Sequence, residues 1–121
     1  LGEGGSVEPS PYDRPTDVQE MSALDTLRQC AVEQWVHVHR QGLPDRQLRA
    51  ARMKILCGTA ATAFSIETGE DLQEVFLRMN ASDVDRQHPW LVPWLAQCFD
   101  MEQAKVLGYL NRWVRTIRSQ Q

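Results

Sequence analysis

Histidines and cysteines are the side chains of this sequence best suited to ligate a metal or attack a substrate. His37 and His39 lie two positions apart, so on a helix their side chains point to different sides. Zinc sites usually need a C-x-x-C pair or two histidines four positions apart, and neither spacing occurs. We therefore expect no metal site and no cofactor. We also expect Cys30, Cys57 and Cys98 to be buried, reduced thiols.

The sequence carries no motif that is typical of an enzyme active site. It has no nucleophile elbow, no glycine-rich phosphate loop and no H-E-x-x-H zinc-binding helix. The carboxylates at residues 70–71 and 83–85 stand where predicted helices begin, and capping of backbone N–H groups accounts for them. We therefore expect no catalytic residue, and a function that depends on binding.

Length and composition fit one globular domain. The chain has 121 residues, of which 42% are hydrophobic and 24% are charged. The net charge is −3, and the first 25 residues hold six acidic side chains and one basic one. No window reaches the roughly 18 apolar residues of a membrane span, and the acidic, glycine-rich start is unlike a signal peptide. These features predict a cytoplasmic protein.

Apolar residues recur at spacings of three and four, which predicts amphipathic helices. No segment alternates as a strand would, so the predicted fold class is all-α, a compact bundle of four to six helices. Residues 1–15, rich in glycine and proline, are expected to form an extended, mobile arm before a single helical domain at 16–121. The helices are predicted at about residues 16–40, 45–68, 70–79, 93–99 and 100–118, with a turn or short helix at 80–85.

Several local signals refine this prediction. Capping boxes at residues 16–19 and 100–103 predict helix starts, and Ser82 is expected to cap the short helix that follows residue 80. Pro93 should begin the helix that contains it, because proline breaks a helix interior. Gly58 costs about 1 kcal/mol relative to alanine inside a helix. We expect the close approach of another helix at Gly58 to compensate for that cost.

Arginines recur every three residues on two predicted helices, an arrangement that can follow the phosphates of a nucleic acid. A solvated polar face opposite the core is the more common explanation for such a pattern. The acidic first part of the chain also works against DNA binding. We therefore expect nucleic acid binding to be unlikely. The two stripes are Arg46, Arg49 and Arg52, and Arg112, Arg115 and Arg118.

The stretch "HPWLVPWLAQCF" at residues 88–99 holds two of the chain's four tryptophans and two of its six prolines. Tryptophan and arginine are enriched at the hot spots of protein interfaces. Trp90 and Trp94 form either a buried corner of the core or a ridge that faces a partner. We predict the ridge, with Leu91, Leu95 and Phe99 turned toward the core. The predicted partner-binding residues are Trp90, Leu91, Trp94, Arg112 and Arg115.

The first predicted helix is long and broadly apolar for one side of a monomer. This indicates a homodimer in which the apolar stripe is partly buried across a twofold axis. The predicted dimer-interface residues are Leu24, Leu27, Ala31, Trp35 and Val38.

The helical segments "DTLRQCAVEQWVHVHR" and "AKVLGYLNRWVRTIRSQ" resemble the small helical antiactivators of bacterial quorum sensing. The resemblance extends over residues 25–121 and assigns no role to a particular residue. It implies binding to the ligand-binding domain of a LuxR-type transcription activator, which would block that activator's dimerisation or its access to DNA. Two other classes stay open: a secretion chaperone, and a small DNA-binding accessory protein that uses the arginine stripes.

Overall fold

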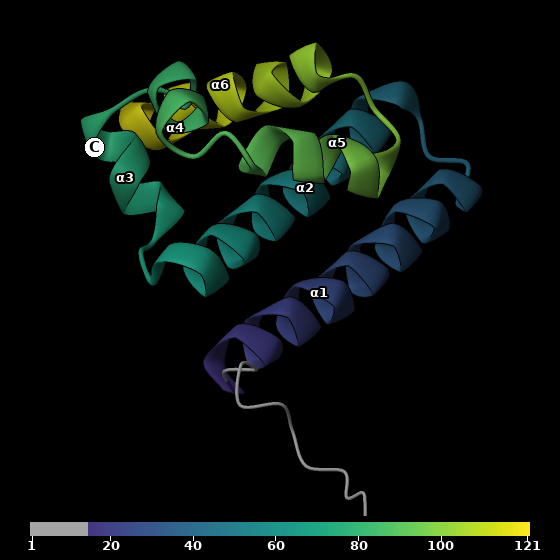
Figure 1. The fold of residues 1–121 in the computed structure, drawn as a ribbon. Coiled ribbons are helices and arrows are strands. Elements are labelled where there is room, and N and C mark those ends of the chain that lie inside the picture. Colours follow the sequence, from purple (N-terminus) through teal and green to yellow (C-terminus); the bar gives the residue numbers. More distant parts are fainter. Residues whose placement is uncertain (1–14) are drawn as a thin grey trace, which may run out of the picture.

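The computed structural model describes the backbone of residues 15–121 and the side chains of residues 23–121. The arm predicted before residue 16 and the capping box at residues 16–19 therefore lie outside the described side chains. The all-α prediction is confirmed, since the described part forms a compact arrangement of six helices (Figure 1). No helix in this part is long and apolar enough to cross a membrane. The helices are α1 (Pro15–Arg40), α2 (Asp45–Thr68), α3 (Leu72–Arg78), α4 (Ala81–Gln87), α5 (Leu91–Phe99) and α6 (Gln103–Ser119).

The two long helices form an antiparallel pair at one edge of the domain (Figure 1). α1 ends at Arg40, and Gly42 has a φ of +66°, a left-handed conformation that glycine adopts without strain. The chain then reverses into α2. The helices α3, α5 and α6 pack on α2, α4 packs on α6, and α5 also reaches α1.

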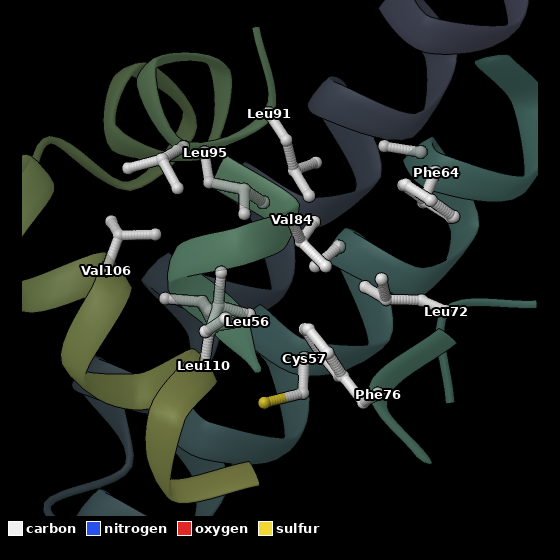
Figure 2. Packing of buried hydrophobic residues seen from close by; sticks show 14 of the residues in the cluster. Leu56, Cys57, Phe64, Leu72, Phe76, Val84, Leu91, Leu95, Val106 and Leu110 are labelled. Carbon is white, nitrogen blue, oxygen red and sulfur yellow. The ribbon is translucent and has the colours of Figure 1, made fainter. Parts of the chain in front are cut away.

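The hydrophobic core lies between α2 and the helices that follow it (Figure 2). Leu56 and Phe64 of α2, Phe76 of α3 and Leu95 of α5 have no exposed surface, and Leu110 of α6 is 1% exposed. Burying a side chain of this size contributes about 1.5–3 kcal/mol relative to leaving it in water. The core therefore holds α3, α4 and α5 in place, although each is too short to be stable alone.

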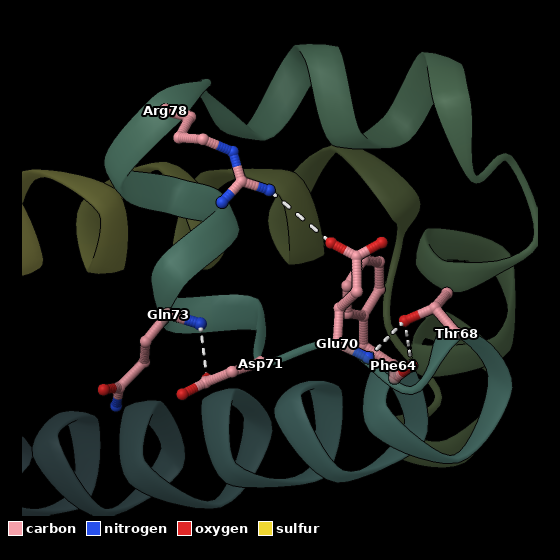
Figure 3. A network of polar contacts seen from close by, with 6 residues as sticks. All are labelled: Phe64, Thr68, Glu70, Asp71, Gln73 and Arg78. Carbon is pink, nitrogen blue, oxygen red and sulfur yellow. Dashed lines mark hydrogen bonds and ion pairs between the residues drawn. The ribbon is translucent and has the colours of Figure 1, made fainter.

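The connection between α2 and α3 is fixed by local hydrogen bonds (Figure 3). The Thr68 hydroxyl donates to the Phe64 carbonyl at 2.7 Å and accepts from the Glu70 N–H at 3.1 Å. The Asp71 carboxylate accepts from the Gln73 N–H at 3.0 Å and so caps α3. These bonds satisfy backbone groups that the helix ends leave unpaired.

The last helix holds α3 through its C-terminal half. The indole of Trp113 packs edge-on against the ring of Phe76, with ring centroids 5.5 Å apart. Arg118 Nε donates to the Phe76 carbonyl at 3.1 Å. The arginine stripe predicted on this helix is therefore not one continuous solvated face, because its last member is tied to α3.

α5 begins two residues earlier than predicted. Its first residue is Leu91, which puts Pro93 at the third helical position. The first four N–H groups of a helix have no intrahelical acceptor, so a proline at this position removes no hydrogen bond. The proline therefore stands inside the first turn without breaking it.

Two predicted caps are also wrong. Asn80, and not Ser82, caps α4, through reciprocal hydrogen bonds with Asp83 of 3.0 and 3.2 Å. α6 begins at Gln103, after Glu102, whose side chain makes no capping bond. Asp100 instead ends α5 in a left-handed conformation with a φ of +50°. Its carboxylate is therefore not placed to cap the next helix.

The close helix crossing predicted at Gly58 is absent. A Cβ added at this glycine would meet nothing within 4 Å. Gly58 is exposed and lies on a groove between α1 and α2 that Leu27, Ile55 and Thr62 also line. The cost of glycine in the helix interior is therefore not compensated by packing at this position.

Candidate functional site: a cationic, aromatic cavity

A cavity of about 480 Å³ opens where α1, α2 and α6 meet the end of α5. Its volume lies in the range of ligand pockets, about 300–1,000 Å³. The lining residues come from four segments that are distant in sequence. They are Trp35 and His39 of α1, Arg49 and Arg52 of α2, Phe99, Asp100 and Met101 at the end of α5, and Lys105, Gly108, Tyr109 and Arg112 of α6.

The amphipathic pattern of α6 determines which of its side chains face the cavity. Val106, Leu110 and Val114 point into the core and are at most 4% exposed. Residues 105, 108, 109 and 112 follow the same three-and-four spacing on a neighbouring face. The cavity wall on α6 therefore carries a cation at each end, with a glycine and a tyrosine between them.

Trp35, His39 and Arg52 form a connected group at the back of the cavity. Arg52 Nε donates to His39 Nε2 at 2.9 Å, and His39 Nδ1 lies 2.6 Å from the Trp35 carbonyl oxygen. Because Nε2 accepts a hydrogen bond, the ring proton must be on Nδ1, which donates to that carbonyl. The Arg52 guanidinium also lies 6.0 Å from the centroid of the Trp35 ring, within cation–π range. The Trp35 ring in turn packs on Phe99, with centroids 4.4 Å apart.

Positive charge dominates the lining. Four cationic side chains and one carboxylate face the cavity, a local charge of +3 in a chain whose net charge is −3. None of the four cations forms an ion pair with a carboxylate of the part that the structure describes. Unpaired cations that line one cavity attract an anion. The cations are Arg49, Arg52, Lys105 and Arg112, and the carboxylate is Asp100.

The residues predicted to bind a partner are not gathered at one place. Leu91 has no exposed surface and belongs to the core, where its side chain points toward the other buried residues (Figure 2). It therefore cannot contact a partner directly. Arg112 lines the cavity, whereas Arg115 is exposed outside it. Trp90 and Trp94 are half-buried at the start of α5, outside the cavity lining.

Trp94 packs toward α1 of its own chain. The Arg28 guanidinium lies 5.9 Å from the centroid of the Trp94 ring, within cation–π range. The same guanidinium donates to Gln97 Oε1 at 3.2 Å. Trp94 therefore helps to join α1 to α5, and only part of its ring is left for a partner.

The stripe predicted as a dimer interface faces the core of its own chain. Ala31 is 2% exposed, so a second copy cannot reach it. Leu24, Leu27 and Trp35 are partly buried against the core, and Val38 is half-buried. Among the described side chains of α1, the exposed large apolar ones are Val32 (37%) and Val36 (39%), one turn apart. The homodimer stays a prediction, and these two residues offer it apolar surface.

The cysteines differ from one another in exposure. Cys57 and Cys98 are buried as predicted, but Cys30 is exposed on α1. Burial raises the pKa of the Cys57 thiol from 9.0 to about 12. Burial also raises the pKa of Cys98, and the nearby Arg28 offsets part of that rise. Both buried thiols therefore stay protonated at neutral pH.

Among the described side chains, no three histidine, cysteine or acidic residues lie close enough together to hold a metal ion. The imidazole of His37 is hydrogen-bonded to the Gln41 amide at 2.9 Å. His39 is occupied at both ring nitrogens, as described above. Neither histidine side chain is arranged to bind a metal with a neighbouring ligand.

Only two of the lining residues were predicted to contact another molecule, Arg112 at a partner and Trp35 at a dimer interface. Arg49 and Arg52 were predicted only as members of an arginine stripe, and no binding role was predicted for His39, Lys105 or Tyr109. The segment "KVLGYLNR" (residues 105–112) contained a usable signal. Its cations stand seven positions apart on the face that also carries a glycine and a tyrosine, beside the apolar face.

No protein-family model matches the chain, and comparisons with curated proteins and with solved structures find no match. The geometry and charge of the cavity are therefore the features of this chain that indicate a function.

Proposed function

We propose that this protein is a non-enzymatic regulator that binds an acidic site of a partner protein at the cationic cavity and holds that partner inactive. The observation that carries the proposal is the set of four cations around the cavity, which have no carboxylate partner among the described residues. Such cations keep their capacity for charge-assisted hydrogen bonds to an external anion. Two partly exposed aromatic rings, Trp35 and Tyr109, supply apolar surface beside them.

A protein partner fits these residue types better than a free inorganic ion does. Arginine, tryptophan and tyrosine are the residue types that dominate the binding energy of protein interfaces. A stable interface buries roughly 1,200–2,000 Å² in total, more than the cavity alone can provide. The partner would therefore also cover the surface around it. The exposed Val32 and Val36 of α1 supply apolar area for such a contact.

The resemblance to quorum-sensing antiactivators makes a LuxR-type transcription activator the first partner to test. Binding would block the activator's dimerisation or its access to DNA. By mass action, the free activator would then be drawn into the inactive complex. This proposal places the protein in the cytoplasm, where such activators act.

The test is affinity capture from a nuclease-treated bacterial lysate with matched charge variants. The cavity variant Arg49→Gln/Arg112→Gln removes two lining cations. The control variant Arg78→Gln/Arg86→Gln removes two exposed arginines of α3 and α4, helices that do not line the cavity. We expect the cavity variant to recover at least about ten-fold less partner, which corresponds to the loss of one charge-assisted hydrogen bond, and the control to recover the wild-type amount. Equal recovery by both variants would contradict the proposal.

Nucleic acid is the second candidate, because α2 and α6 bring arginines of both stripes to one cavity. In that case the complex would form only when nuclease is omitted. Its affinity would also fall steeply with salt, since bound phosphates release counterions. A partner that is captured after nuclease treatment and withstands moderate salt would exclude this candidate.

A further inference from the structure

We infer that the cavity recognises an aromatic side chain flanked by carboxylates, and that Arg52 is the residue that holds one of these carboxylates. This inference rests on the proposed function, because it names the part of the partner that enters the cavity. Three observations support it: the contacts that orient Arg52, the arrangement of aromatic rings, and the spacing of the cations along α6.

Arg52 is held in position before any ligand binds. Its Nε donates to His39, and its guanidinium lies over the Trp35 ring. Its two terminal amino groups have no partner among residues 23–121. A guanidinium binds a carboxylate best through two parallel N–H donors. Because Nε and the plane of the group are already fixed, little conformational entropy is lost when a carboxylate binds.

An aromatic group fits the space beside Arg52. Trp35 and Tyr109 are half-buried in the lining, and the buried ring of Phe99 lies against Trp35. Aromatic pairs with centroids about 4.5–7 Å apart gain energy beyond the burial of their surface. Gly108 presents no side chain, and a Cβ added there would meet nothing within 4 Å. The lining therefore leaves room next to its rings, where a flat side chain can insert.

The cations of α6 stand on both sides of that space. Lys105 and Arg112 are seven residues apart, which corresponds to about 10 Å along a helix. An extended peptide advances about 3.3 Å per residue, so carboxylates three or four positions apart match this separation. A segment with one aromatic residue between acidic residues can therefore place its ring near Gly108 and its carboxylates near the cations.

Blocked pentapeptides test the inference with the intact protein. The ligand is acetyl-Glu-Glu-Phe-Glu-Glu-amide, and two control peptides replace the phenylalanine with alanine or all four glutamates with glutamine. Binding is followed through the indole N–H resonance of Trp35 in nitrogen-labelled protein, assigned with a Trp35→Phe variant. We expect the acidic aromatic peptide to bind at least about ten-fold more tightly than either control peptide.

Arg52→Lys keeps the charge but removes the planar pair of donors. We expect it to weaken peptide binding about five-fold or more, whereas Arg46→Lys, outside the cavity, should have no effect. Equal binding of the glutamine or alanine peptide would overturn the inference, and so would wild-type binding by Arg52→Lys. If no peptide binds but the cavity variant still loses the partner, the inference is wrong and the proposed function stands. If the cavity variant keeps the partner, the proposed function fails whatever the peptides do.

Discussion

Filling the cavity at Gly108 should abolish binding while making the protein more stable. Gly108 lies in the interior of α6, and a Cβ added there would meet nothing within 4 Å. Because the glycine lines the cavity, we expect the side chain in Gly108→Leu to occupy the space available to a ligand. Most substitutions that abolish binding can also destabilise the fold. Gly108→Leu distinguishes a loss of binding from a loss of stability, because binding is expected to fall while the free energy of unfolding rises.

The gain in stability follows from helix propensity. Glycine is about 0.8–1.0 kcal/mol less favourable than alanine inside a helix, and leucine is close to alanine. Gly108 needs no left-handed conformation, so the substitution brings no backbone strain. We expect the free energy of unfolding to rise by about 0.7 kcal/mol. For a domain of this size, that corresponds to an increase in Tm of about 2–4 °C.

Gly58→Leu is the matched control, because Gly58 is also inside a helix, exposed and free of neighbours within 4 Å. Circular dichroism on heating should show a similar increase in Tm for both variants. Partner capture and peptide titration should show a loss of binding for Gly108→Leu alone. Wild-type binding by a stabilised Gly108→Leu protein would refute the assignment of the cavity as the binding site.

Four further predictions concern the thiols, the core and the oligomeric state. At mildly alkaline pH a thiol reagent should label the exposed Cys30 alone in the folded protein, and all cysteines after denaturation; early labelling of Cys57 would contradict its burial. As the pH rises from 9.0 toward about 12, the free energy of unfolding should fall, because the unfolded chain releases the Cys57 proton first, and denaturant titrations should show a smaller loss in Cys57→Ala, in which Cys98 is the remaining buried thiol. Phe64→Ala should lower the free energy of unfolding by about 3–5 kcal/mol in denaturant titrations, and a loss below about 1 kcal/mol would mean that Phe64 is not in the core. If the protein is a dimer, Val32→Asp/Val36→Asp should shift its mass in sedimentation to that of a monomer, whereas an unchanged dimer would exclude this face.

Much of the fold could be predicted because apolar spacing reports directly on burial. The stripes of the two long helices and of α6 agree with the observed core, and Arg40 and Gly42 mark the end of α1 as expected. The predictions of helix caps were wrong where one residue type can serve two structural roles. Asp100 looks like a helix cap in the sequence, but it ends α5 in a left-handed conformation. An aspartate can cap the start of one helix or end the preceding helix, and tertiary packing decides which role it takes.

The cavity was not predicted, and only Arg112 of its lining was among the predicted partner-binding residues, because the cavity is assembled from four separate segments. The sequence indicates arginines on two helices, but not that Arg49, Arg52 and Arg112 face one another. The apolar stripe of α1 was interpreted as a dimer interface. The sequence alone does not show whether such a stripe packs within its own chain or against another chain. In the structure Ala31 is buried in the core of its own chain, and Leu24 is partly buried against that core.

The way α6 holds α3 has a consequence for synthesis on the ribosome. α3 and α4 each contain seven residues, too few for a stable isolated helix in water. Both pack on α6, and Arg118 binds the Phe76 carbonyl from the far end of that helix. During translation, the α1–α2 pair can form early, but α3 and α4 gain their packing partner only after α6 has left the exit tunnel. Until then the side of α2 that packs on α6 stays exposed to solvent.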